Sequence, residues 1–318
     1  MIEVRDVTKR FGNTVALDRV SFSVEKGKIL GFLGPNGAGK STTMKIITTF
    51  LAADGGQVQV AGIDVLEQPL AVRRRIGYLP ENVPLYQDMN VDEYLTFVGR
   101  ARGLDGARLR ERRDWCVEAC GLRAEFKKRI QDLSKGYKQR TGLAQALIHD
   151  PDILILDEPT SGLDPLQIVS IRRLIASLAG EKTIIFSTHI LQEVGPVTDR
   201  VVIINEGQVV ADGHIGGLVE QAMGQNRVYV AVRGDAADTE HALRGLPGLG
   251  DLRALGEGAG GAARFELRAP FAADLVGDVA RLARERGWDL TELHESRYSL
   301  EDTFIALTRA ARASKEVA

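Results

Sequence analysis

Short apolar runs bounded by turn-forming residues recur along the first 220 positions of the chain. The clearest are Ile29–Leu33, Ile153–Leu156, Thr183–Phe186 and Val201–Ile204. Each is short enough to be a buried strand rather than a helix. Helical patterns near Leu166–Leu178 and Ile190–Val194 separate the later runs. Strands that alternate with helices predict a parallel sheet covered by helices, which is an α/β fold.

The regions between these runs follow other patterns. Residues 2–33 predict antiparallel strands, because apolar Leu17, Val20, Phe22 and Val24 stand among polar residues before a turn at 25–27. A helix is expected over Thr42–Leu51, a turn at 54–56 and a strand at 58–60. Residues 90–146 are mostly helical in pattern.

The composition shifts near residues 222–226, which predicts one domain over 1–222 and a second over 223–318. The predicted elements of the second domain have the order βαββαβ, which is typical of a small ferredoxin-like α+β domain. They are strands at 228–232, 252–255, 265–267 and 290–294 and helices at 239–246 and 272–286. A capping box at Ser299–Asp302 then predicts a last helix.

The overall composition bounds the class of protein. The 318 residues carry a net charge of -2, and a dedicated nucleic-acid binder would be strongly basic, so no nucleic-acid partner is expected. No apolar run approaches the ~18 residues of a membrane span, and Met1–Asp6 contains acids and no apolar core of a leader. We therefore expect a cytoplasmic chain. Cys116 and Cys120 lack further metal ligands and are expected to be reduced, partly buried thiols.

The most specific motif is a complete P-loop between a predicted strand and a predicted helix. It consists of Gly34, Pro35, Asn36, Gly37, Ala38, Gly39, Lys40 and Ser41. Glycines allow successive backbone N–H groups to converge on phosphate oxygens, and the following helix adds its positive end. Lys40 places a charge on the β- and γ-phosphates, and the Ser41 hydroxyl suits Mg²⁺. We include Thr42 in this ATP site, and a chance glycine turn is the weaker alternative.

A second constellation is the pair of acids that ends the apolar run at 153–156. Ligands of open parallel sheets bind at the carboxyl ends of strands, so this pair should lie near the P-loop. Asp157 is expected to hold Mg²⁺ through water, and Glu158 to deprotonate the attacking water. The alternative is a strand that simply ends in a turn at Pro159.

Together these motifs resemble the nucleotide-binding subunits of ABC transporters. Residues 133–137, with Ser134 and Gly136, resemble the signature segment of that family, residues 161–164 its D-loop, and His189 its switch histidine. Phe11 stands where the family stacks an aromatic ring on adenine. The resemblance covers about residues 1–220, with every motif in order.

The resemblance implies a fold, an activity and a set of partners. The fold is a P-loop NTPase of the ABC type, with a mixed sheet core and antiparallel β and helical subdomains, followed by the ferredoxin-like domain. The activity is hydrolysis of ATP with Mg²⁺ in a head-to-tail homodimer. In that dimer Ser134 and Gly136 of one subunit face the γ-phosphate held by Lys40 of the other, and His189 contacts the γ-phosphate and water.

Two features depart from the usual family pattern. Glu81 replaces a glutamine, and its carboxylate either ligates Mg²⁺ or serves only in coupling to a membrane subunit. Lys135 adds charge to the signature segment. Together with Ser299–Phe304 these variants resemble the branch that works with a separate ABC-2 type integral-membrane permease. That branch implies export and attachment to the cytoplasmic face of the membrane, with a regulatory or dimer-contacting tail.

Three other classes remain as alternatives. A non-transport ABC ATPase acting on nucleic acid or ribosomes would need long coiled-coil insertions or a second cassette, and the chain has one motif set and no heptad run. A GTPase or small-molecule kinase would lack the signature segment. A purely regulatory binder that does not hydrolyse ATP would not need Glu158.

Overall fold

The computed structural model describes residues 1–198, 200–296 and 298–316. The chain forms two compact units, Met1–Ile215 and Gly216–Ala318, and each unit has its own apolar core. The domain boundary expected after residue 222 falls inside the helix α7 (Ile215–Met223), at whose first residue the two units divide.

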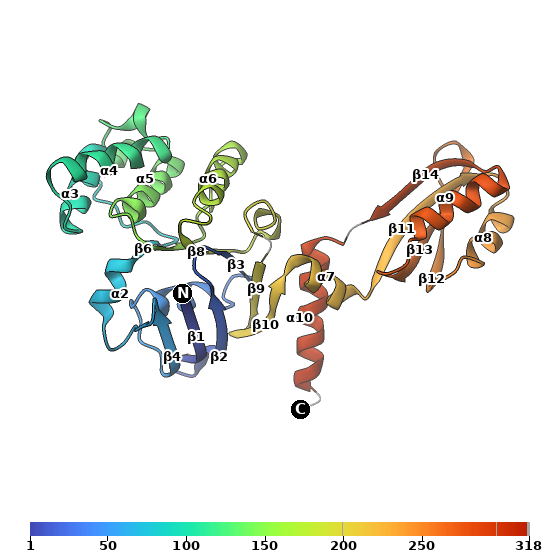
Figure 1. Ribbon diagram of the computed structural model, residues 1–318, viewed down its shortest axis with the longest axis horizontal. Helices are drawn as coiled ribbons and strands as arrows, with labels where there is room; N and C mark the ends of the chain where they lie inside the picture. Colours follow the sequence, from blue (N-terminus) through green and yellow to red (C-terminus); the bar gives the residue numbers. More distant parts are fainter. Residues whose placement is uncertain (199, 297, 317–318) are drawn as a thin grey trace. The chain divides into compact units, whose positions relative to one another are not determined.

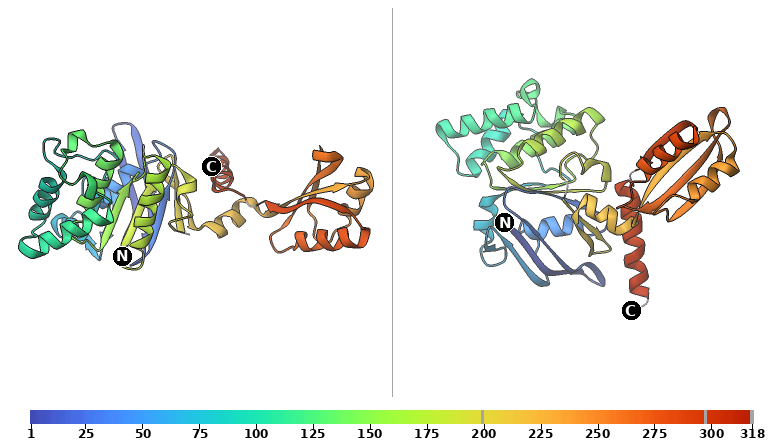
Figure 2. Two further views of the ribbon diagram at one scale, coloured as in Figure 1. Left: turned by 90° about the horizontal axis from the view of Figure 1, so that it is seen from above. Right: turned by 45° about the vertical axis from the view of Figure 1, so that its right-hand side comes forward.

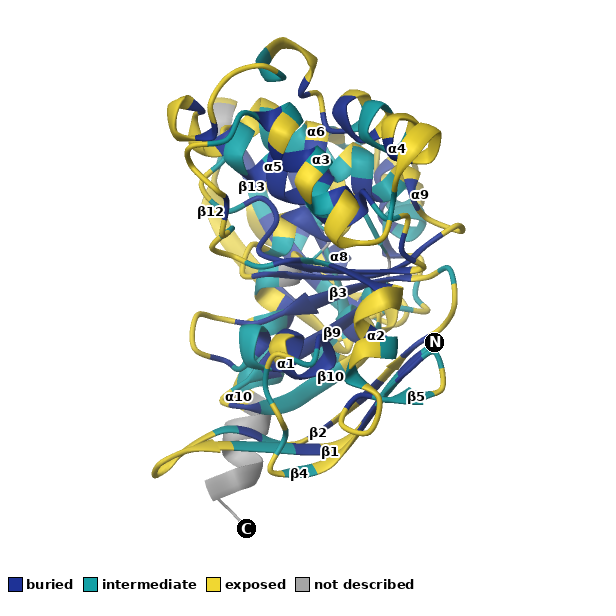
Figure 3. Cartoon of the chain, turned by 90° about the vertical axis from the view of Figure 1, so that its left-hand side faces the viewer, coloured by how far each residue is buried: buried dark blue, intermediate teal, exposed yellow. Residues whose placement is uncertain are grey.

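A six-stranded sheet forms the centre of the first unit, in the order β10-β9-β3-β8-β7-β6. The strands are β10 (Gln208–His214), β9 (Arg200–Asn205), β3 (Ile29–Leu33), β8 (Thr183–Thr188), β7 (Ile153–Asp157) and β6 (Ile76–Leu79). All pairs are parallel except β9 with β10, which confirms the predicted parallel sheet. Every residue of β3, β7 and β8 is buried, as the continuous dark band in Figure 3 shows. The parallel strands therefore present their carboxyl ends at one edge.

A second, antiparallel sheet contains β2 (Thr14–Val24), β1 (Ile2–Phe11), β4 (Gly55–Val60) and β5 (Ile63–Asp64), in that order. The turn expected at 54–56 is wrong, because β4 already begins at Gly55. Gly56 has a φ of 82°, and a Cβ there would stand 2.4 Å from the carbonyl oxygen of Asp6. The glycine is thus required by the close approach of β1 and not by a turn.

Helices cover both faces of the central sheet (Figure 1). On the side of the antiparallel sheet lie α1 (Lys40–Ile47) and α2 (Pro69–Arg75), and on the other side α3 (Val91–Ala101), α4 (Gly106–Ala119), α5 (Lys135–Leu147) and α6 (Pro165–Ser177), as Figure 3 shows. Short 3₁₀ turns occupy Arg123–Glu125, Ile130–Asp132 and Leu191–Glu193. The helix expected at 190–194 is only the last of these turns, and the helix expected to reach Leu51 ends at Ile47. Cys116 and Cys120 are buried free thiols.

The second unit has the βαββαβ order that its sequence pattern predicts. It runs β11 (Gln225–Arg233), α8 (Ala236–Arg244), β12 (Asp251–Glu257), β13 (Ala262–Pro270), α9 (Leu275–Arg286) and β14 (Asp289–Ser296), with a 3₁₀ turn at Ala259–Gly261. The antiparallel sheet has the order β12-β13-β11-β14, which is the ferredoxin-like arrangement. Both helices cover one face of this sheet (Figure 2).

The last helix, α10 (Leu300–Glu316), begins with the predicted capping box. The Asp302 backbone N–H donates to Ser299 Oγ, and the Ser299 backbone N–H donates to Asp302 Oδ2, both at 3.1 Å. These reciprocal bonds satisfy donors that the first turn of a helix leaves unpaired.

Candidate functional site

The P-loop connects β3 to α1 at the carboxyl edge of the central sheet. Gly37 and Gly39 have φ values of 81° and 108°, which favour glycine. A Cβ on Gly39 would also stand 2.6 Å from the Leu17 side chain, and one on Gly34 would stand 2.4 Å from the Ile204 carbonyl oxygen. The loop therefore packs closely against β2 and β9, and its glycines allow α1 to begin at this edge of the sheet.

Lys40 is the first residue of α1 and is almost fully buried, with 5% of its surface exposed. Its Nζ donates to the carbonyl oxygens of Gly34 and Pro35, at 2.8 and 3.2 Å. It also lies 3.2 Å from Glu158 Oε1. A buried ammonium group needs such partners, and the loop carbonyls and Glu158 provide them.

Glu158 follows β7 directly and adopts a left-handed backbone with a φ of 50°. Such strain in a residue with a side chain is concentrated at functional sites. The Glu158 backbone N–H donates to Ser187 Oγ at 3.0 Å, and Ser187 Oγ donates to Asp157 Oδ1 at 2.6 Å. Ser187 of β8 thereby fixes both acids at the end of the neighbouring strand.

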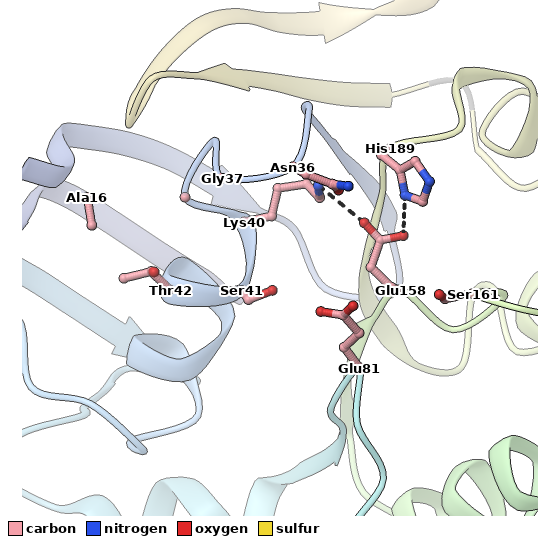
Figure 4. A pocket seen from close by; sticks show the side chains of 11 residues that line it. Ala16, Asn36, Gly37, Lys40, Ser41, Thr42, Glu81, Glu158, Ser161 and His189 are labelled. Carbon is pink, nitrogen blue, oxygen red and sulfur yellow. Dashed lines mark hydrogen bonds and ion pairs between the residues drawn. The ribbon is translucent and has the colours of Figure 1, made fainter.

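His189 follows β8 and meets Glu158 at the same edge. Its Nδ1 lies 2.8 Å from Glu158 Oε2, so the glutamate contacts Lys40 with one oxygen and His189 with the other (Figure 4). The His189 side chain is 42% exposed, whereas that of Glu158 is 7% exposed. The histidine thus connects a buried carboxylate to solvent.

These groups surround a cavity of about 410 Å³. It is lined by Ala16, Asn36, Gly37, Gly39, Lys40, Ser41, Thr42, Glu81, Glu158, Ser161 and His189. The structure therefore brings together most of the P-loop, Glu158, His189 and Glu81, which lies two residues after β6. A polar cavity with one buried lysine, a helix N-terminus and a carboxylate beside a histidine is suited to hold a phosphate chain and to deprotonate a water.

Hard oxygen ligands for a magnesium ion are available in the cavity. In Figure 4 the Ser41 hydroxyl and the Glu81 carboxylate face the same space. Asp157 does not line the cavity and is 1% exposed. No group of three or more His, Cys, Asp or Glu residues that suits a metal occurs in the described part of the chain. Ser41 and Glu81 nevertheless fit Mg²⁺, because this ion binds through one or two protein oxygens together with substrate phosphates and water.

Besides Asp157 and the loop residues Gly34, Pro35 and Ala38, three further predicted site residues do not line the cavity. Ser134 is the exposed N-cap of α5, where its Oγ accepts a bond from the Tyr137 backbone N–H at 3.4 Å. Gly136 is buried against Gln167, whose side chain would meet a Cβ at 2.1 Å. Phe11 is 49% exposed, and Lys9 Nζ lies 5.6 Å from the centre of its ring. None of the three lines the cavity.

Two lining residues and one supporting residue are absent from the sequence-based site. Ser161 belongs to the segment that resembles a D-loop, so its position after Glu158 was a usable signal. Ser187 is a hydroxyl inside an apolar strand, a weaker signal of a polar contact. Ala16 reaches the cavity from β2, and nothing in its sequence context indicates that.

A second groove, of about 720 Å³, lies between α1, α2, β6 and the end of α3. Phe50, Arg73, Tyr78, Pro80 and Arg102 are among its lining residues. Burial, and then the charge of Asp157, raise the pKa of Tyr78, so its hydroxyl stays protonated. Pro80 immediately precedes Glu81, so one short segment lines both the groove and the cavity.

Comparison with known proteins gives concordant results. The family model described as ABC transporter matches residues 17–161. The chain is 33% identical to the daunorubicin resistance ATP-binding protein DrrA3 of Streptomyces coeruleorubidus, over 100% of this chain and 98% of that protein. It is 37% identical to the Nod factor export ATP-binding protein I of Burkholderia lata, over 70% of this chain and 74% of that one.

Among solved structures, a dimeric bacterial ABC transporter cassette matches with a TM-score of 0.63 at 25% identity. The match covers 68% of this chain and 99% of the cassette. Within the described residues, none of the helices combines the length and the apolar character that crossing a bilayer requires.

Proposed function

Because the chain belongs to the ABC transporter family as an ATP-binding subunit, we propose that it hydrolyses ATP in the cavity around Lys40 and Glu158. The observation that carries this proposal is the geometry of Glu158. One buried carboxylate contacts the phosphate-binding lysine with one oxygen and the exposed His189 with the other. A group in that position can take a proton from a water beside the last phosphate.

The P-loop residues bind and orient the phosphate chain. Free backbone N–H groups at the start of α1 would donate to phosphate oxygens, and Lys40 would supply a positive charge to the β- and γ-phosphates. Ser41 and Glu81 would hold Mg²⁺, which would supply further charge at the phosphate oxygens. Asp157 does not line the cavity, so it would act on the ion only through an intervening water. The acids and the serine are hard ligands of the kind that this ion prefers.

Glu158 and His189 act on the water. Glu158 accepts its proton, and His189 holds the carboxylate in place through the 2.8 Å contact to Oε2. The ion pair with Lys40 competes for the same carboxylate. Phosphate oxygens that bind Lys40 therefore weaken this pair and leave Glu158 free to act as the base.

A second copy of the chain would complete the site. Ser134 and Gly136 lie outside the cavity, yet Ser134 is exposed at the N-terminus of a 13-residue helix. Such a terminus binds anions, so in a head-to-tail homodimer it can face the γ-phosphate of the partner. The match to a dimeric cassette supports this arrangement. We propose that the exposed Phe11 stacks on adenine.

The partner in the membrane is proposed to be an ABC-2 type permease on the export side of the family. The relative named as a Nod factor export protein supports export. The groove with Phe50 and Tyr78 offers apolar and cationic contacts for a permease segment. Since Pro80 and Glu81 continue from this groove into the cavity, docking there can influence the ATP site.

The proposal is tested by Glu158→Gln. We expect ATP binding to be retained, because Lys40 and the loop backbone remain and one competitor for Lys40 is removed. Turnover should be at least ~10²-fold lower, because a general base typically contributes that much. Steady-state phosphate release and equilibrium nucleotide binding measure the two quantities. Glu118→Gln, an exposed carboxylate that pairs with Arg123, is the control and should behave as wild type. Unchanged turnover in Glu158→Gln would remove Glu158 from the role of base.

A further inference from the structure

A second buried carboxylate lies close to the site but does not line the cavity. Glu193, the last residue of the 3₁₀ turn after β8, is 4% exposed. Its Oε2 accepts hydrogen bonds from two threonine hydroxyls, Thr160 Oγ1 at 2.6 Å and Thr188 Oγ1 at 2.9 Å. Both threonines are buried as well, with 4% and 0% exposure. One oxygen atom thus joins two segments that are distant in sequence.

The two threonines occupy informative positions. Thr160 stands between Glu158 and Ser161, both of which line the cavity. Thr188 is the last residue of β8 and directly precedes His189. Its hydroxyl oxygen also accepts a bond from the Ile190 backbone N–H at 3.0 Å, which fixes the backbone on the far side of His189. Glu193 therefore connects the segment that follows Glu158 with the segment that contains His189.

This arrangement is costly if it serves only to fill space. Glu193 Oε1 is buried and has no hydrogen-bond partner among the described residues. A buried carboxylate with an unsatisfied oxygen destabilises a fold, and apolar residues of similar volume often replace such groups without loss. Bonds to a charged acceptor are, however, shorter and stronger than neutral ones, so they fix geometry well.

We propose that Glu193 is a positioning residue for ATP hydrolysis, which sets the position of His189 relative to Glu158 through Thr160 and Thr188. The inference rests on the proposed hydrolysis at Glu158. The direct contact between Glu158 and His189 involves a 42% exposed imidazole, where water competes for the bond. The bonds of Glu193 to Thr160 and Thr188 are buried, so water does not compete for them, and they fix the distance between the segment after Glu158 and the segment at His189. A movement of the chain at Ser161 would therefore also move His189.

The sharpest test removes one hydroxyl without changing shape. Thr160→Val deletes the 2.6 Å bond that the Thr160 hydroxyl donates to Glu193. We expect kcat to fall at least about tenfold, because small displacements of catalytic groups cost up to ~10²-fold. The Kd for ATP should change less than about threefold, since the P-loop is intact. Thr160→Ser should restore most of the turnover.

Thr239→Val is a matched control, because Thr239 is buried and its hydroxyl bonds to Asp235 O in the second unit. It should leave kcat unchanged. A kcat of Thr160→Val equal to that of wild type, or a serine variant as slow as the valine variant, overturns the proposal.

A second variant tests the acceptor itself. In Glu193→Ala the link is already lost, so adding Thr160→Val should lower kcat by much less than it does in wild type. If Thr160→Val lowers kcat by the same factor in Glu193→Ala as in wild type, Thr160 does not act through Glu193. If Glu193→Ala does not fold, the comparison of Thr160→Val with Thr160→Ser alone decides. A wild-type chain that binds ATP but never hydrolyses it would instead contradict the proposed function.

Discussion

Single residues at the carboxyl edge of the central sheet act through partners that come from other strands. Glu158 of the β7 end has its carboxylate between α1 and the end of β8, and its backbone is held by Ser187. The strained φ of 50° at Glu158 aims its side chain at these partners. A charged side chain can be buried at this edge only where a neighbouring group compensates its charge.

His149 shows the same rule with an uncompensated group. Burial, and then the charge of Arg102, lower the pKa of His149 to about 4. Its Nε2 faces the Ile76 carbonyl oxygen at 3.2 Å, and its Nδ1 is buried without a partner. The folded state therefore takes up this proton only near pH 4, whereas the unfolded chain takes it up near 6.5.

Stability from His149 is accordingly complete above pH 6.5 and is lost as the pH falls toward 4. We expect His149→Gln to lack this loss. Between pH 7 and pH 5, the free energy of unfolding of wild type should fall by about 2 kcal/mol more than that of the variant. Urea unfolding at both pH values measures the difference. A parallel decline in both proteins would contradict the burial argument.

At the scale of helices and strands, the sequence predicted elements best where local chemistry alone determines them. The P-loop, the strands β3, β7 and β8 and the capping box at Ser299 were predicted because glycine geometry, apolar runs and caps act over a few residues. Gly55–Gly56 was misread as a turn, because the reason for glycine there is the approach of β1 from across the sheet. The strand β10 and the helix α7 lacked a clear local pattern.

The residues of the site were likewise predicted where local sequence motifs identify them and missed where contacts between strands bring them together. Most of the P-loop, Glu158, His189 and Glu81 were predicted to form the site and do line one cavity. Ala16 and Ser187 were missed, because their contacts depend on which strands lie side by side. The roles proposed for Ser134, Gly136 and Phe11 depend on groups outside this chain, so they remain predictions.

Two helix caps allow the proposed dimer to be tested. Asn90 caps α3 with a reciprocal pair of 2.9 Å bonds to Glu93. The Ser134 cap bond of 3.4 Å is long and weak. Asn90→Ala should cost about 1 kcal/mol of stability and leave turnover unchanged, because the cap is purely structural.

Ser134→Ala should cost less stability than Asn90→Ala and yet lower turnover at least about tenfold, if its hydroxyl faces the partner's phosphate. Chemical denaturation and phosphate release report the two effects. Normal turnover in Ser134→Ala would argue against the proposed head-to-tail site.

At the scale of the whole molecule, the chain divides its tasks between two units. All residues that line the ATP cavity lie in Met1–Ile215, and that unit has a core of its own. The ferredoxin-like unit has a separate core around Val230 and Phe265. We propose that it regulates the cassette or contacts the dimer partner.

A chain that ends at Ile215 should therefore still bind ATP, with a Kd within about threefold of that of the full-length protein, because no lining residue is removed. Titration with a fluorescent nucleotide measures this. A loss of binding despite a cooperative unfolding transition would show that the second unit shapes the cavity.

The strand β6 lies at one edge of the central sheet and leads through Pro80 to Glu81. Among the described residues its ladder bonds are to β7 only. The strands that lead to Lys40, Glu158 and His189 are each flanked on both sides. Local opening of β6 breaks one ladder instead of two, so its amides should exchange with solvent at a lower opening free energy than those of β3, β7 or β8. The central sheet should therefore open more easily at the strand that leads to Glu81 than at the strands that lead to Lys40, Glu158 and His189.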